Sequence, residues 1–421
     1  SRETITGHMD QAETSCPGSD LYSKLPLLKV GNPVRIGAEK LFESDYFDLI
    51  KNKKIGLVTN HTGLLPNGEH IVDLLHENSE TELTMLFGPE HGIRGEEDTH
   101  VTDSKDEKTG LPVISLYGKT RKPTAEMLKE VEVLIFDIQD IGARYYTYIK
   151  TMLLAQEAAA ENDITFLVLD RPNAIGGIYI DGPVGKPGEP VSDIDMLPIT
   201  HGMTVGELAT MFNKEREKLG LTAADLQVIP MENYGRGLWY DQTGLPWIKP
   251  SPNMLNLTTA AFYPATCLLE GTNVSEGRGT LQPFELIAAP WINPEELITQ
   301  FQSYNLEGVS YKPTKITPQQ MVDGIEIYPP KFMGEQIPAV QMTLTARDNF
   351  KSVEAGIYIL HALKELYPEK LEWRLPRLDD LLKTDKVRKA LDAGKQPQEI
   401  IQTWQEDLEY FKKIRTQYLL Y

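Results

Sequence analysis

A short glycine-rich segment, EGTNVSEGRGT at residues 270–280, carries several side chains that could perform chemistry. It places the carboxylates of Glu270 and Glu276 six residues apart, Arg278 two residues further on, and Asn273 between the two acids. Glycine lets a backbone approach a ligand closely, and arginine binds a carboxylate through two parallel hydrogen bonds. Hydrolysis of an acetal needs one acid and one base or nucleophile, so either glutamate is a candidate for the second group. The alternative is a loop in which Glu270 and Arg278 only pair with each other.

A second segment of the same character, LFGPEHGIRG, lies far upstream at residues 86–95. Glu90 follows a Gly-Pro pair at the end of an expected strand, and proline stiffens the backbone on both sides of it. A general acid needs such a fixed position and a raised pKa. We expect Glu90 to act as the acid and His91 to assist it, to orient it or to bind substrate. The alternatives for Glu90 are a place in a helix N-cap region or an ion pair with Arg94, and the alternative for His91 is an ordinary hydrogen-bonded role.

Polar side chains follow three of the expected strands. In a parallel sheet the carboxyl ends of the strands share one edge, where ligands bind. Carboxylate and amide groups suit sugar hydroxyls, and tyrosine rings suit a sugar face. For the segment that follows the expected strand 131–137, the alternative is a strand end followed by a helix cap, in which Arg144 pairs with Asp140 four residues earlier. The residues expected to bind substrate are Asn60, His61, Arg94, Asp137, Gln139, Asp140, Arg144, Tyr145, Asn253, Asn273 and Arg278. Asn253 lies in a rigid PSPN turn. Asp140 is also a candidate for the second carboxylate.

Strand and helix patterns alternate through the first two-thirds of the chain, which predicts a mostly parallel sheet covered by helices on both faces. The expected strands are 54–60, 83–87, 131–137 and 164–169, and the expected helices are 124–130, 148–162 and 204–219.

After residue 294 the pattern changes to that of a smaller α+β domain. The expected strands there are 309–313, 324–328 and 339–345, and the expected helices are 353–366, 376–392 and 397–417. We therefore expect a disordered or extended lead at 1–32, a catalytic domain at 33–290 and a smaller domain at 291–421.

The composition narrows the function. The net charge is −19 and the pI about 4.9, which argues against nucleic acid or an anionic membrane as the main partner. Any anionic ligand must therefore be bound by local arginines. Two cysteines, Cys16 and Cys267, are too few for a disulfide framework, and we expect Cys267 to be a core residue. No apolar run is long enough to span a bilayer.

Several familiar motifs fail. The Tyr117–Thr120 segment resembles the end of a phosphate-binding loop, but Val113 stands where that loop needs glycine. No dinucleotide-binding or serine-hydrolase motif is present. His91, Asp98 and His100 have no strong metal-ligand spacing, and a metal-dependent hydrolase is the least favoured hypothesis.

Ten sequence blocks, taken together and in this order, resemble the NamZ/YbbC-like exo-β-N-acetylmuramidases, a former domain-of-unknown-function family now placed among the glycoside hydrolases. The resemblance covers residues 33–421. The blocks are LVTNHTG (57–63), LFGPEHGIRG (86–95), SLYG (115–118), FDIQDIGARYYTYI (136–149), LDRPN (169–173), HGMTVGELA (201–209), PSPNM (250–254), YPATCLLEGTNVSEGRGT (263–280), PFE (283–285) and YLLY (418–421).

The resemblance implies a Rossmann-like larger domain, a smaller C-terminal domain and a cleft between them. It implies release of terminal N-acetylmuramic acid from the non-reducing end of peptidoglycan fragments such as muropeptides, without a cofactor. The proposed catalytic glutamate of the family corresponds to Glu90. Muramic acid carries a lactyl carboxylate, for which Arg94, Arg144 and Arg278 are the candidate cations. The substrate favours a periplasmic or extracellular location, although cytoplasmic recycling would look the same in sequence.

A different class of function fits the same cleft. A non-catalytic muropeptide- or sugar-binding protein also closes two domains on a ligand. Release of sugar from a chromogenic muramic acid glycoside distinguishes the enzyme from the binding protein.

Overall fold

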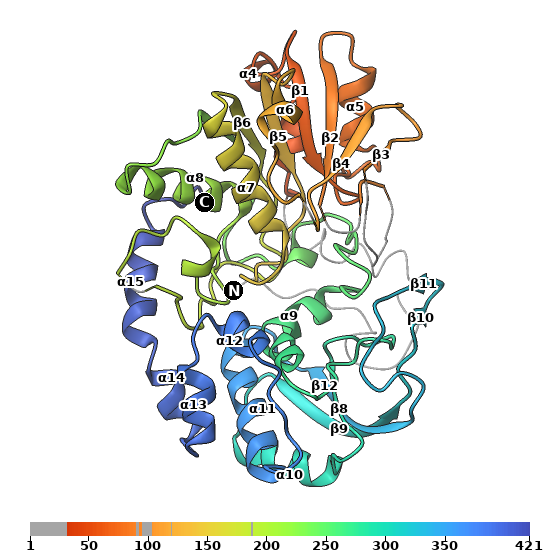
Figure 1. The fold of residues 1–421 in the computed structure, drawn as a ribbon, viewed down its shortest axis with the longest axis vertical. Coiled ribbons are helices and arrows are strands. Elements are labelled where there is room, and N and C mark those ends of the chain that lie inside the picture. Colours follow the sequence, from red (N-terminus) through yellow and green to blue (C-terminus); the bar gives the residue numbers. More distant parts are fainter. Residues whose placement is uncertain (1–31, 90–91, 95–102, 119, 187) are drawn as a thin grey trace.

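A seven-stranded sheet forms the centre of the amino-terminal part of the chain in this computed structural model (Figure 1), which describes residues 32–89, 92–94, 103–118, 120–186 and 188–421. The strand order is β3-β4-β2-β1-β5-β6-β7, and every neighbouring pair is parallel except β3 with β4. The expected mostly parallel sheet is thus confirmed. Its strands are β1 (Lys54–Thr59), β2 (Glu82–Gly88), β3 (Ser104–Lys105), β4 (Pro112–Ser115), β5 (Val133–Asp137), β6 (Thr165–Leu169) and β7 (Leu226–Ile229).

Alternate strand residues enter two separate cores, because successive side chains of a strand point to opposite faces. Leu57 of β1 belongs to a core on one face, whereas Val58 belongs to a larger core on the other. Both faces are buried, which is why these strands are continuous apolar runs. The helices that pack on the sheet are α3 (Gly37–Lys40), α5 (Ile71–Glu77), α7 (Tyr148–Glu161) and α8 (Val205–Lys218), with α4 (Ser44–Phe47) and α6 (Ala125–Leu128) nearby in the chain.

A three-stranded antiparallel sheet, in the order β8-β12-β9, forms the carboxyl-terminal part. Its edge strand β8 (Leu286–Ala288) lies within residues 33–290, so the placement of the domain boundary at 290 stays a prediction. The other strands are β9 (Val309–Ile316), β12 (Ile337–Leu344) and the hairpin β10 (Met321–Val322) with β11 (Ile325–Glu326). The helices are α9 (Leu257–Thr266), η4 (Cys267–Gly271), α10 (Pro294–Ser303), α11 (Ser352–Leu366), α12 (Arg377–Leu382), α13 (Lys386–Asp392), α14 (Pro397–Gln402) and α15 (Gln405–Arg415).

The two long helices expected near the carboxyl end are each divided into two. Residues 376–392 contain α12 and α13, separated at Lys383, whose φ of 55° is in the left-handed region. A left-handed residue ends a helix even where the apolar period continues. The expected strand at 324–328 is also shorter, because only Ile325 and Glu326 are paired. Cys267 is fully buried, as expected.

The end of the chain returns to the amino-terminal part. Helix α15 leads to a C-terminus that lies beside α8 (Figure 1). The hydroxyl of Tyr421 donates to Asp170 Oδ2 at 2.7 Å and accepts from the Met231 N–H at 2.7 Å. Asp170 directly follows β6, so the tail is attached at the carboxyl edge of the large sheet.

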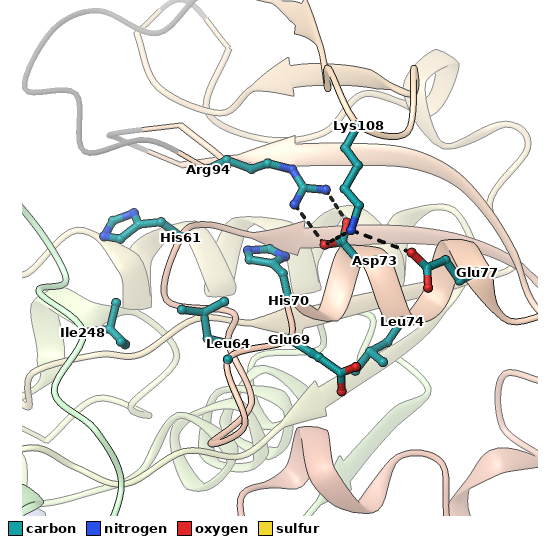
Figure 2. Close-up of a pocket in the computed structure, with 11 residues that line it drawn as sticks. His61, Leu64, Glu69, His70, Asp73, Leu74, Glu77, Arg94, Lys108 and Ile248 are labelled. Atoms are coloured by element: carbon teal, nitrogen blue, oxygen red, sulfur yellow. Dashed lines mark hydrogen bonds and ion pairs between the residues drawn. The ribbon is translucent and has the colours of Figure 1, made fainter.

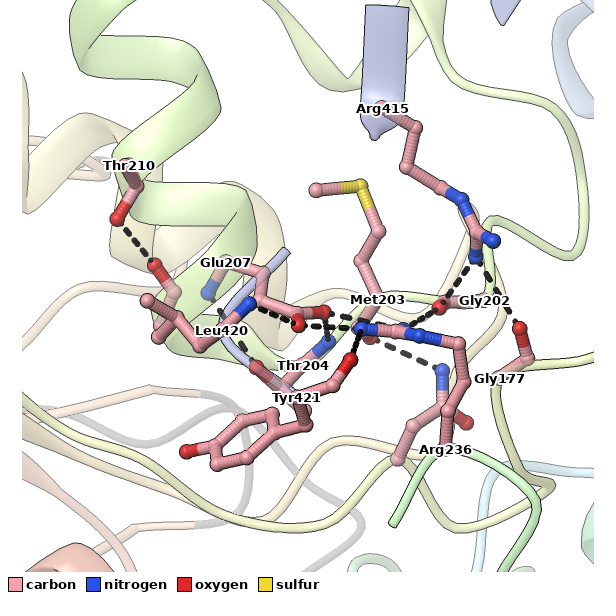
Figure 3. A network of polar contacts seen from close by, with 12 residues as sticks. Gly177, Gly202, Met203, Thr204, Glu207, Thr210, Arg236, Arg415, Leu420 and Tyr421 are labelled. Atoms are coloured by element: carbon pink, nitrogen blue, oxygen red, sulfur yellow. Dashed lines mark hydrogen bonds and ion pairs between the residues drawn. The ribbon is translucent and has the colours of Figure 1, made fainter. Parts of the chain in front are cut away.

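Charged side chains surround this tail in a connected network (Figure 3). Glu207 accepts the backbone N–H of Leu420 at 2.8 Å and pairs with Arg236 at 2.5 Å. Arg236 also donates to the backbone carbonyl of Tyr421 at 3.1 Å and to that of Gly202 at 2.7 Å. The tail therefore links the two parts of the molecule through bonds that are largely shielded from water.

We expect Tyr421→Phe to lower the free energy of unfolding by about 1–2 kcal/mol, because a buried N–H and a buried carboxylate each lose a hydrogen-bond partner. Urea denaturation measures the change. Tyr410→Phe is the matched control, since Tyr410 is exposed on α15, and it should stay within about 0.5 kcal/mol of wild type. Equal stability of the two variants would contradict a role for the tail in stability.

Candidate active site

The strand order of the large sheet reverses at β1, which has β2 on one side and β5 on the other. Ligands of such sheets bind beyond the strand ends at this point. Here the two loops are tied together: Thr59 Oγ1 donates to the Asp137 carbonyl at 2.8 Å, and the Gln139 N–H donates to Thr62 Oγ1 at 3.0 Å. Asn60 Oδ1 accepts both the N–H and the hydroxyl of Thr62. The side chains of Asn60 and Gln139 are buried at this edge of the sheet.

Asp137 is not available to substrate. Its carboxylate is fully buried and accepts two hydrogen bonds from Arg171, at 2.5 and 2.9 Å. Burial acts to lower the pKa of Arg171, but the Asp137 carboxylate outweighs it and raises that pKa. The expectation that Asp137 binds sugar is therefore corrected, since a buried charge needs its partner. Arg171 lies in the LDRPN block directly after β6. This position at a strand end is the only feature of the sequence that could have indicated Arg171 as a residue of this edge.

Arg144 is likewise buried, with 1% of its surface exposed. Its guanidinium donates to the carbonyls of Pro183 and Leu197 at 2.6 Å and of Leu381 at 2.7 Å. Burial lowers its pKa to about 10. Arg144 neither faces a cavity nor pairs with Asp140, so both readings of it from sequence are wrong. It joins the large sheet to α12 instead.

Asn273 makes structural contacts, and its expected contact with substrate stays a prediction. Its side chain donates to the Lys370 carbonyl at 2.8 Å and accepts the Glu372 N–H at 3.0 Å. These bonds fix the 270–280 loop against the segment that precedes α12.

A cavity of about 620 Å³ lies beside α5. We call it the α5 cavity, and His61 and Arg94 line it (Figure 2). Arg94 pairs with Asp106 at 2.5 Å and with Asp73 at 2.6 Å, and Lys108 pairs with Asp73 at 2.8 Å. Burial acts to raise the pKa of Asp106, but Arg94 and Thr109 lower it to about 2. Two carboxylates thus already satisfy Arg94.

A smaller cavity of about 220 Å³ brings together residues from both parts of the chain. We call it the tyrosine cavity. Four residues expected from sequence line it, namely Tyr145, Asn253, Glu270 and Arg278. Its lining is completed by Tyr117, Tyr146, Thr147, Tyr148, Ser251, Met254, Tyr263, Phe284 and Arg377.

The aromatic wall of the tyrosine cavity is rigid. Tyr145 packs edge-on against Tyr263 with ring centroids 5.4 Å apart, and Tyr263 packs against Phe284 at 4.7 Å. The Tyr145 hydroxyl donates to the Pro264 carbonyl at 2.6 Å. Burial raises the pKa of Tyr145, so its hydroxyl stays protonated. Such a wall offers ring faces and hydroxyls to a polar ligand.

Glu270, which also lines the tyrosine cavity, is bound by two arginines. Arg278 Nη2 donates to Glu270 Oε1 at 2.9 Å, and Arg377 donates to Glu270 Oε2. Although burial acts to raise the pKa of Glu270, the two arginines lower it to about 2. The pairing of Glu270 with Arg278 that the spacing suggested is confirmed. Arg377 lies in a plain helical pattern, and no sequence signal indicated it.

Glu276 does not line the tyrosine cavity. It is 4% exposed and lies 2.9 Å from Lys331 Nζ and 3.4 Å from Arg278 Nε. Lys331 also donates to the carbonyls of Leu269 and Val274, so this ion pair closes the base of the 270–280 loop.

Glu90 and His91 lie outside the described residues, as do Asp98 and His100. The strand before Glu90 is described: Gly88 at the end of β2 pairs with Ser115 of β4. Tyr117, two residues beyond Ser115, lines the tyrosine cavity. On the other side of Glu90 and His91, the Gly92 N–H donates to the Pro89 carbonyl at 3.3 Å.

No group of three or more His, Cys, Asp or Glu side chains in the described part of the chain is arranged to hold a metal ion. No helix found there has the length and apolar character needed to cross a bilayer.

A Rossmann-like sheet, a smaller antiparallel sheet and a polar cavity between them define a two-part α/β protein with a site suited to sugar. Residues 55–258 match the family described as "Exo-beta-N-acetylmuramidase NamZ, N-terminal", and residues 261–421 match its C-terminal counterpart. The chain belongs to the NamZ exo-β-N-acetylmuramidase family, which is a family of glycosidases.

Individual relatives agree with this assignment. The peptidoglycan β-N-acetylmuramidase NamZ of Bacillus subtilis (strain 168) is 44% identical over 393 residues, which is 92% of this chain and 91% of the relative. A crystal structure of a DUF1343 family protein from Bacteroides fragilis NCTC 9343 is 36% identical, with a TM-score of 0.83 over 92% of this chain and 99% of its own. A second DUF1343 protein from that organism is 36% identical, with a TM-score of 0.71 over 93% and 99%.

Asp140 is 5% exposed and accepts the Gly142 N–H at 2.7 Å. It does not line the tyrosine cavity. Burial raises its pKa to about 7, and the hydrogen bonds from Gly142 and Ile141 only partly oppose this. The folded protein therefore keeps a proton on Asp140 that the unfolded chain has already lost.

We expect this proton to make the free energy of unfolding fall as pH rises from about 4 to about 7. Asp140→Asn should reduce that slope by at most about 1.4 kcal/mol per pH unit, which corresponds to one proton. Urea denaturation at several pH values measures the slope. Asp323→Asn, at an exposed hairpin position, is the control. An unchanged slope in Asp140→Asn would show that Asp140 is ionised throughout.

Proposed function

We propose that this protein is an exo-acting glycoside hydrolase that releases β-linked N-acetylmuramic acid from the non-reducing end of peptidoglycan fragments. Membership of the NamZ family and the activity named for the Bacillus subtilis relative support the reaction class. They favour the enzyme over the alternative of a non-catalytic sugar-binding protein.

The tyrosine cavity is the observation that carries the proposal for the site. It joins the carboxyl edge of the large sheet, through Tyr117 and Tyr145, to the 270–280 loop, through Glu270 and Arg278. At about 220 Å³ it is smaller than the roughly 300–1,000 Å³ of pockets for drug-sized ligands. A cavity of this size suits a single terminal sugar, as exo action requires.

Glu90 is proposed as the general acid. The described residues nearby support this proposal: Gly88 is in register with Ser115, and Tyr117, two residues after Ser115, lines the cavity. Glu270 does not suit this role, because arginines bind both of its carboxylate oxygens and hold its pKa well below the usual range.

The second carboxylate is constrained by the same geometry. Of the three candidates from sequence, Glu270 alone lines the cavity, and both of its oxygens are bound by arginine. Glu276 and Asp140 are buried away from it. We therefore propose that Glu270 contributes a fixed negative charge and holds the arginines, and does not accept a proton.

The substrate supports a proposal for location. Peptidoglycan lies outside the cytoplasmic membrane, so we propose a periplasmic or extracellular site of action. An immunoblot of separated cell fractions tests this, and protein confined to the cytosol would point to recycling of imported fragments.

Glu90→Gln should lower kcat on a chromogenic β-glycoside of N-acetylmuramic acid by roughly 10²–10⁴-fold, the usual contribution of a general acid, with an unchanged circular dichroism spectrum. Glu82→Gln is the matched control, because Glu82 is exposed at the opposite end of the same strand, β2. Near-normal turnover by Glu90→Gln would remove Glu90 from the role. Binding of sugar without release by the wild type would favour the capture protein.

A further inference from the structure

The wall of the tyrosine cavity that comes from the carboxyl-terminal part is cationic. Arg278 and Arg377 both line it, and both are bound to Glu270, one on each carboxylate oxygen. The side chains of Arg278 and Arg377 are 29% and 53% exposed, whereas that of Glu270 is 17% exposed. The two guanidinium groups are therefore more exposed than the carboxylate that they bind, and that of Arg278 also lies over the Phe284 ring, 5.0 Å from its centroid.

Each guanidinium has donors to spare. An arginine carries five N–H donors. Within the described part of the chain, Arg377 uses one Nη2 donor on Glu270, and Arg278 uses one Nη2 donor on Glu270 and directs Nε toward Glu276. The remaining N–H groups are bonded to no described residue and can bind a further acceptor.

The local charge is positive on a strongly negative protein. Arg278, Arg377 and Lys331 give three positive charges, and Glu270 and Glu276 give two negative charges, so this connected group has a net charge of +1. The whole chain has a net charge of −19. An anion is thus attracted to this wall by short-range contacts, while the rest of the surface repels it.

The other arginines considered for this role are already satisfied. Arg94 in the α5 cavity is bonded to two carboxylates, and Arg144 is bonded to three carbonyls. Arg278 and Arg377 are the two arginines among the described residues that line the tyrosine cavity.

We propose that Arg278 and Arg377, presented by Glu270, form the subsite that binds the lactyl carboxylate of the terminal sugar and selects muramic acid over neutral hexosamines. The inference rests on the proposed glycosidase function and adds its specificity determinant. Two guanidinium groups on one carboxylate provide charge-assisted hydrogen bonds in a partly buried setting. Glu270 acts through the arginines, so it is a positioning residue.

The test compares two chromogenic glycosides, one of N-acetylmuramic acid and one of its lactyl amide, which removes only the charge. Wild type should prefer the acid by roughly 10- to 100-fold in kcat/KM, the value of a charge-assisted hydrogen bond. Arg377→Ala should lose most of that preference, mainly through KM for the acid, and Arg377→Lys should keep part of it. Arg374→Ala is the matched control, because Arg374 is exposed three residues earlier and does not line the cavity; it should keep the full preference.

Binding measurements separate failure of the subsite from failure of the enzyme. N-acetylmuramic acid and its lactyl amide are titrated into the wild type and Arg377→Ala by calorimetry. Arg377-dependent binding of the acid without hydrolysis would support the subsite and overturn the proposed function. Hydrolysis with the same acid-to-amide preference in Arg377→Ala and wild type would overturn the subsite and leave the function standing. Neither binding nor hydrolysis of the acid would overturn both.

Discussion

The junction between the two parts of the molecule depends on arginines whose N–H groups bind oxygen atoms of a distant segment. Arg144, next to the large sheet, donates to Leu381 of α12. Arg415 at the end of α15 donates to the carbonyls of Gly177 and Gly202, and Arg236 donates to the carbonyl of Tyr421. A buried guanidinium without acceptors is costly, so these contacts fix how the segments meet.

The contact between Arg144 and Leu381 also affects the candidate site, because it positions α12. Arg377 stands at the first position of that helix and Leu381 near its end. Arg144 binds the carbonyl of Leu381, while Glu270 binds the side chain of Arg377. A buried arginine thus positions the helix that presents an exposed arginine to the cavity. The aromatic wall, which combines Tyr145 of the amino-terminal part with Tyr263 and Phe284 of the carboxyl-terminal part, lines the same cavity, so ring faces and positive charge meet in a space suited to one sugar.

Much of the scaffold was predictable, because its signals are local. The strands β1, β2, β5 and β6 are continuous apolar runs since both of their faces are buried, and α8 begins where Thr204 accepts the Glu207 N–H in a capping box. The pairing of Glu270 with Arg278 followed from glycine-rich spacing within eleven residues. The ten matching blocks indicated the family for the same reason, since each is a contiguous run of residues.

The roles of single polar residues were less predictable, because burial depends on partners far away in the chain. Asp137 is bound by Arg171, Arg144 by carbonyls up to 237 residues away, and Arg377 reaches Glu270 across 107 residues. The sequence by itself determined the element types and the family, since these rest on neighbouring residues. Only the tertiary structure decided which arginines face the cavity, because that depends on which oxygen atoms the fold brings within hydrogen-bond distance of each guanidinium.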